Sequence, residues 1–150
     1  MSRSGYSDDC DDNLDFGRWR GRVAQATRGK RGQQLLRDLA AAMDAMPEKK
    51  LIAHNLTDAN GCHCALGAVA ARRGIDTAAI EFPVDPWDVE IEDTERVAEA
   101  LDIAYPLACE VMFINDESYA KSDEERWQFV RKWVASQIIE PTPGEDPSDA

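Results

Sequence analysis

The chain has 150 residues, of which 43% are hydrophobic, and its formal net charge at pH 7 is −12. A strongly acidic surface is repelled by phosphate backbones and anionic lipid headgroups, which argues against general affinity for DNA, RNA or membranes. No apolar run is long enough to span a bilayer, and the N-terminus has no apolar signal region, so we expect a cytoplasmic protein. We also expect one globular domain at 15–139 between disordered acidic tails at 1–14 and 140–150.

The spacing of apolar residues predicts a mainly α (α+β) fold, a compact domain of about five to six helices with one small β-hairpin near 50–64. The first helix shows the pattern, because Phe16, Trp19 and Val23 fall on one helical face. The last is introduced by a capping box, in which Ser122 and Glu125 satisfy free N–H groups. Helices are predicted at about 15–27, 32–46, 65–73, 92–101, 104–114 and 122–138.

The hairpin prediction depends on a turn signal between two short segments. Lys50–Leu56 resembles a strand, and Cys62–Cys64 would be the returning strand. Asn60-Gly61 between them is typical of a type I′ turn, which needs positive φ at both central residues.

Basic side chains gather in one segment. Seven Lys and Arg and no acid lie between 16 and 37. Such a segment could bind a phosphate or an acidic protein, or it could be a solvated face or pair internally with carboxylates. The candidate anion- or partner-binding residues are Arg18, Arg20, Arg22, Arg28, Lys30 and Arg31.

Gly29-Lys30-Arg31-Gly32 also resembles the GXXG loop of KH domains, which clamps a nucleic-acid backbone between two helices. The resemblance implies nucleic-acid binding through a loop at Gly29–Gly32. The chain departs from the KH pattern because no strand is predicted before the first helix.

A second charged region is acidic. Residues 81–102 hold nine carboxylates and one basic residue, Arg96. This density could imitate nucleic acid and occupy a basic groove on another protein, or it could only increase solubility. The candidate acidic partner-binding residues are Asp88, Glu90, Glu92, Asp93, Glu95 and Glu99.

The sulfur and imidazole groups suggest a less favoured alternative. The chain holds four cysteines, which a cytoplasmic protein keeps as thiols. Zinc could be held by Cys62 and Cys64 if further ligands converge on them, although neighbours on a strand alternate in direction. The further candidate ligands are His54 and Cys109.

Residues 94–114 could form a helix-turn-helix, but the second helix carries Glu110 and no Lys or Arg. DNA reading needs cations on that helix, so an ordinary helical hairpin is the better interpretation.

Several blocks of the chain form a recognisable set: Arg28-Gly-Lys-Arg-Gly-Gln-Gln-Leu-Leu-Arg-Asp-Leu, Met46-Pro-Glu-Lys-Lys-Leu-Ile, Cys64-Ala-Leu-Gly-Ala, Ile114-Asn-Asp-Glu, Glu125-Arg-Trp and Trp133-Val. Together they resemble an uncharacterised family of small proteins encoded by bacteriophages and prophages. The resemblance implies no activity, only a phage setting and therefore action in the host cytoplasm.

Together these patterns predict a non-enzymatic phage-type accessory protein without a cofactor. It would bind a host or phage protein by charge complementarity and modulate it, in host takeover or counter-defence. The alternatives are nucleic-acid or phosphate binding through the segment Arg18–Arg37, and zinc binding through Cys62 and Cys64.

Overall fold

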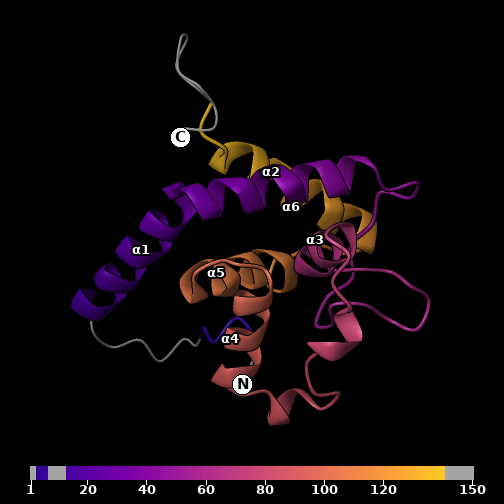
Figure 1. The fold of residues 1–150 in the computed structure, drawn as a ribbon, viewed down its shortest axis with the longest axis horizontal. Coiled ribbons are helices and arrows are strands. Elements are labelled where there is room, and N and C mark those ends of the chain that lie inside the picture. Colours follow the sequence, from indigo (N-terminus) through magenta and orange to yellow (C-terminus); the bar gives the residue numbers. More distant parts are fainter. Residues whose placement is uncertain (1–2, 7–12, 141–150) are drawn as a thin grey trace.

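The computed structural model describes residues 3–6 and 13–140. Within these residues the chain forms six α-helices and two short 3-10 helices (Figure 1). The α-helices are α1 (Asn13–Arg28), α2 (Lys30–Asp44), α3 (Ala65–Arg72), α4 (Ile91–Ala100), α5 (Tyr105–Asp116) and α6 (Asp123–Gln137), and the 3-10 helices are η1 (Thr77–Ala79) and η2 (Pro86–Asp88).

The mainly helical class is confirmed. Helices α1 and α2 follow one another as a bent rod along one side of the molecule, and α5 lies in the middle with α4 below it (Figure 1). Helix α2 packs against α3 and α6, while α5 packs against α1 and α4. The central helices therefore have more than one neighbour, and their apolar residues are buried on more than one face.

The core follows the predicted helical spacing in most places. Leu35, Leu36 and Leu39 of α2 are fully buried, as are Val130 and Val134 of α6. Burial of each such side chain stabilises the fold by about 1.5–3 kcal/mol before entropy is counted. The prediction is less accurate for α1, whose first turns extend past the core and leave Phe16 exposed.

The break between α1 and α2 falls at Gly29, as predicted, but its surroundings differ from the predicted loop. Lys30, Arg31 and Gly32 already belong to the first turn of α2. Gly32 is buried at the bend where the two helices meet, and a Cβ there would lie 2.0 Å from the backbone oxygen of Ala26. Gly32 is thus needed for close helix packing, and the chain does not form a GXXG loop here.

The predicted β-hairpin near 50–64 is wrong: the described residues contain no strand, only an isolated antiparallel bridge between Thr57 and His63. Gly61 does have a positive φ of 77°, and Asp58 N–H donates to the carbonyl of Cys62, so the chain turns here. Backbone bonds join the two segments at only a few points, such as Ile52 N–H to the carbonyl of His63, and other N–H groups before the turn bond to side chains. Leu56 donates to the Glu81 carboxylate at 2.9 and 3.1 Å.

Part of the predicted N-terminal tail is packed against the domain. Arg3 and Ser4 are buried, and the Arg3 guanidinium forms two hydrogen bonds of 2.5 and 2.7 Å with Asp116 of α5. The carbonyl of Arg3 accepts from the Thr94 hydroxyl of α4 at 2.9 Å. The rest of that tail, 1–2 and 7–12, and nearly all of the C-terminal one, 141–150, lie outside the described residues.

A search of the described helices for one long and apolar enough to cross a membrane finds none.

Candidate functional site

Five of the six candidate acidic residues share one exposed region, which we call the acidic face: Asp88, Glu90, Glu92, Glu95 and Glu99. Three of them, at positions 92, 95 and 99, have the spacing of one helical face of α4. None of the five forms an ion pair with another described residue. Their negative charge is therefore not neutralised within this part of the chain.

The sixth candidate, Asp93, has a structural role instead. Its carboxylate accepts the N–H of Glu90 at 2.8 Å and pairs with Arg96 at 2.9 Å. The N–H of Glu90 is the main cause of the lowered pKa of Asp93, and it outweighs the opposing effect of partial burial. We therefore leave Asp93 out of the acidic face.

Two large exposed apolar side chains lie in the segment that leads into the acidic face. Val84 is 97% exposed and Trp87 is 87% exposed. Both lie in the irregular segment between Ile80 and α4, and Asp85 caps the short helix η2 by accepting the Trp87 N–H at 3.0 Å. An exposed tryptophan next to unpaired carboxylates is the composition of a protein-binding surface.

The basic segment divides into paired and unpaired side chains. Arg20 forms two hydrogen bonds of 2.9 and 2.6 Å with the buried Glu110 of α5 and so fastens α1 to α5. Arg18 lies 3.7 Å from Asp15, and Arg31 lies 3.1 Å from Asp102. Arg22, Arg28 and Lys30 form no ion pair with a described residue, and Arg22 stacks over Trp19 instead.

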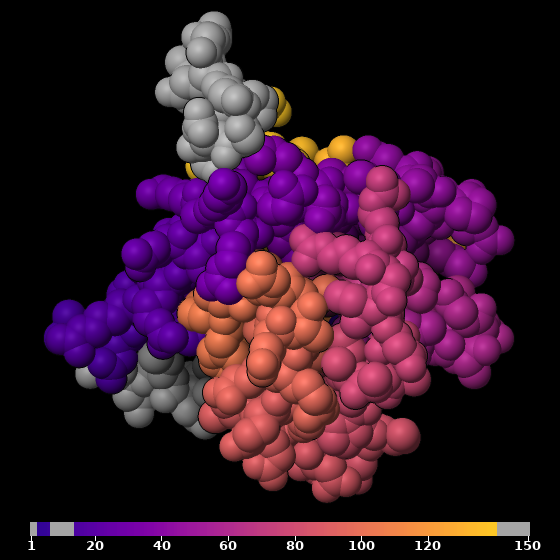
Figure 2. Space-filling view, in the orientation of Figure 1, coloured from indigo at the N-terminus to yellow at the C-terminus, as the bar shows by residue number. Residues whose placement is uncertain are grey.

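The basic segment and the acidic face lie at separate parts of the molecule. In Figure 2 the segment is indigo to purple and runs along the upper left, whereas the residues around 81–95 form the lower end. The two regions approach each other at the start of α5, where Arg22 and Glu95 have opposite effects on the pKa of Tyr105. Elsewhere they form two poles, each suited to a different kind of charged partner.

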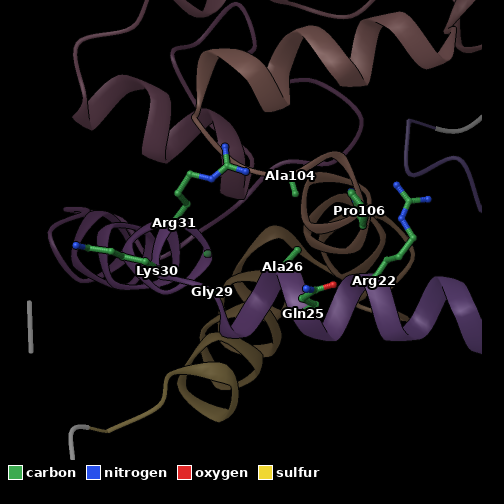
Figure 3. Close-up of a pocket in the computed structure, with 9 residues that line it drawn as sticks. Arg22, Gln25, Ala26, Gly29, Lys30, Arg31, Ala104 and Pro106 are labelled. Atoms are coloured by element: carbon green, nitrogen blue, oxygen red, sulfur yellow. The ribbon is translucent and has the colours of Figure 1, made fainter. Parts of the chain in front are cut away.

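A groove of about 480 Å³, which we call the elbow groove, opens where α1 meets α2. It contains three of the six candidate basic residues, Arg22, Lys30 and Arg31. In Figure 3, Arg31 reaches toward Ala104 and Arg22 stands beside Pro106, while Lys30 points away from the other labelled side chains. The structure thus brings together side chains from the two basic helices and the start of α5.

The candidate zinc ligands do not converge. Among the described residues there is no group of three or more His, Cys, Asp or Glu that could hold a metal ion. Cys64 is buried at the start of α3, where its sulfur accepts the N–H of Gly67 at 3.4 Å. Burial is the main cause that raises the pKa of the Cys109 thiol to about 11, so this thiol is protonated at neutral pH.

Sequence reasoning missed the exposed Val84 and Trp87 and the anchoring role of Arg3. The signal for the first pair was available, because Pro83 and Pro86 interrupt any regular element around them and apolar residues in such a segment have few local partners. No local signal predicts that Arg3 reaches Asp116, since 113 positions separate the two residues.

Comparisons of the chain with protein-family models, curated proteins and solved structures find no match. The resemblance to phage-encoded proteins therefore stays a prediction from the sequence.

Proposed function

We propose that this chain is a non-enzymatic accessory protein that binds a basic protein through the acidic face and modulates its activity. The observation that carries the proposal is that Val84 and Trp87 are exposed and that the segment following them carries five exposed carboxylates, which form no ion pair with a described residue. Buried apolar contact would supply affinity, and the surrounding charges would supply orientation and a fast encounter.

The surface fits a specific kind of partner. Tryptophan is enriched among the residues that dominate binding energy, and such anchors insert into apolar pockets surrounded by polar contacts. A matching partner presents an apolar pocket for Trp87 with Lys and Arg at its rim, as on a surface that normally holds nucleic acid. A nucleic acid would be repelled from this face because both surfaces are negative.

The biological setting of the proposal is a bacteriophage protein that acts in the host cytoplasm, in host takeover or counter-defence. The support for this setting is the sequence resemblance, together with the absence of a recognised catalytic motif in the sequence. The partner would be a host or phage protein whose basic site the acidic face occupies.

The test is affinity capture from a bacterial lysate with mass spectrometry of the retained proteins. Trp87→Ala should weaken capture of the main basic partner by roughly 30-fold, because truncating such an anchor costs about 2 kcal/mol or more. Tyr119→Ala is the matched control, since Tyr119 is also fully exposed but lies outside the acidic face.

The role of the acidic face is tested by reversing the charge of two of its carboxylates and, as a control, of two carboxylates elsewhere. Glu92→Lys with Glu95→Lys should abolish capture, while Glu124→Lys with Glu140→Lys, which makes the same change in net charge on exposed residues elsewhere, should preserve it. Equal capture by both double variants and by Trp87→Ala would remove the acidic face from the function.

A further inference from the structure

We propose that the elbow groove binds a small phosphorylated ligand of nucleotide size. The groove is lined by residues other than those of the acidic face, and its charge has the opposite sign, so this site would bind a different ligand from the protein partner. Its walls come from three elements: α1, the first turn of α2 and the start of α5.

The charge of the lining selects an anion. Three cations and no carboxylate line the groove, and the cations are Arg22, Lys30 and Arg31. Figure 3 places Arg31 and Arg22 on opposite sides of Pro106, so each guanidinium could contact a different phosphate group of one ligand. A carboxylate that competes for Arg31 is Asp102. Both side chains of this ion pair are exposed to solvent, so a bound phosphate could replace Asp102 as the partner of Arg31.

Residues at the N-terminal ends of two helices line the same groove. Helix α2 begins at Lys30 and α5 begins at Tyr105, and neither N-cap residue, Gly29 or Ala104, provides a side-chain acceptor for the first N–H groups. Helix N-termini carry a partial positive charge that favours anions. The two ends thus add to the field of the three cations and do not oppose it.

The size and the apolar lining of the groove indicate the part of the ligand that is not phosphate. A groove of about 480 Å³ lies within the range of small-molecule sites. Beside the cations its surface is apolar, formed by Ala26, Ala104 and Pro106, and could contact a planar ring. A phosphate joined to a flat apolar body is the chemistry of a nucleotide.

A long nucleic acid fits the molecule less well. The chain carries a net charge of −12, and a strand that left the groove would meet repulsive carboxylates elsewhere on the surface. A small ligand avoids this repulsion because all of its charge stays beside the basic side chains.

The test is isothermal titration calorimetry of the full chain at low salt with ATP, GTP, inorganic phosphate, adenosine and a single-stranded 20-mer. ATP or GTP should bind, and adenosine, which lacks phosphate, should not. Arg22→Ala with Arg31→Ala should weaken binding at least tenfold. Arg28→Ala, which removes an exposed cation outside the groove, should change affinity less than twofold.

Asp102→Asn gives a gain-of-affinity test. It releases Arg31, and Asn tolerates the positive φ of 53° at this position, so nucleotide affinity should rise about two- to fivefold. Thermal unfolding of every variant confirms that it is folded. Three results would overturn the proposal: no nucleotide binding at millimolar concentration, equal affinity for adenosine, or tighter binding of the 20-mer that the double variant does not weaken.

Discussion

At the scale of single residues, the most consequential contact is the ion pair of Arg3 and Asp116, because both side chains are almost fully buried. Asp116 also accepts the N–H of His54 at 3.1 Å and the amide of Asn115 at 2.8 Å. The carboxylate is thus surrounded by donors and depends on one guanidinium for neutralisation. This contact fastens the N-terminal segment to α5.

Replacement of Arg3 by Ala removes the guanidinium that neutralises the buried Asp116, so we expect the free energy of unfolding to fall by roughly 3 kcal/mol. Urea denaturation followed by circular dichroism measures this loss. Arg18→Ala is the control, because the Arg18–Asp15 pair is exposed and should contribute less than about 0.5 kcal/mol. A similar small loss for both variants would show that Arg3 is not an anchor.

At the scale of elements, the bend between α1 and α2 determines the shape of the elbow groove. Gly32 allows the two backbones to approach, and the same need arises where α3 meets the preceding loop, since a Cβ on Gly67 would lie 1.9 Å from the carbonyl oxygen of Leu56. Both positions require glycine because a side chain has no space there, and neither glycine has a positive φ.

Gly32→Ala should destabilise the protein by about 1–3 kcal/mol, because the added methyl meets backbone atoms that cannot rotate away. Gly21→Ala in α1 is the matched control. Nothing lies within 4 Å of a Cβ there, so the higher helix propensity of Ala should leave stability unchanged or raise it by up to about 1 kcal/mol. Thermal denaturation compares the two, and an unchanged Gly32→Ala variant would contradict the close packing at the bend.

At the scale of the whole molecule, two regions of opposite charge remain after folding, although some charged side chains of each region are paired inside the protein. Arg20 and Asp93 are used to hold helices in place, whereas Arg22, Lys30 and the acidic face stay available. The two proposals use different poles, and a variant at one pole tests only the function assigned to it.

A buried carboxylate outside the acidic face, Asp116, determines how the stability of the protein responds to pH. Burial opposes the charged form of Asp116, but the Arg3 ion pair and the neighbouring N–H donors outweigh it and lower its pKa. A carboxyl whose pKa is lowered by folding stabilises the protein above its unfolded pKa of about 3.9, and the stabilisation is lost as pH falls through the lower folded value. Exposed carboxylates such as Asp44 contribute little.

We therefore expect the free energy of unfolding to decrease below about pH 4, and Asp116→Asn to flatten this decrease. Denaturation titrations between pH 2.5 and 7 measure both curves. If the variant retained the full slope, other groups would control the acid response.

Local patterns were enough to predict the helices. The 3.6-residue spacing identified Val130 and Val134 as core residues, and the cap at Ser122 accepts the N–H of Glu125 at 3.1 Å as expected. A capping box would have the Glu125 carboxylate accept the backbone N–H of Ser122. It accepts the backbone N–H of the preceding residue, Lys121, instead. Helices and their caps depend on residues within about four positions, so the sequence contains this information directly.

The candidate site could be predicted only in composition. The sequence by itself determined that one basic segment and one acidic stretch exist. Only the tertiary structure decided that Arg20 is paired with Glu110 and that Trp87 is exposed, because these outcomes depend on the position of distant residues. The hairpin prediction was wrong for the same reason: the distant carboxylate of Glu81 binds the N–H groups of Leu56 and Thr57, two groups that could otherwise extend the few backbone bonds between the segments.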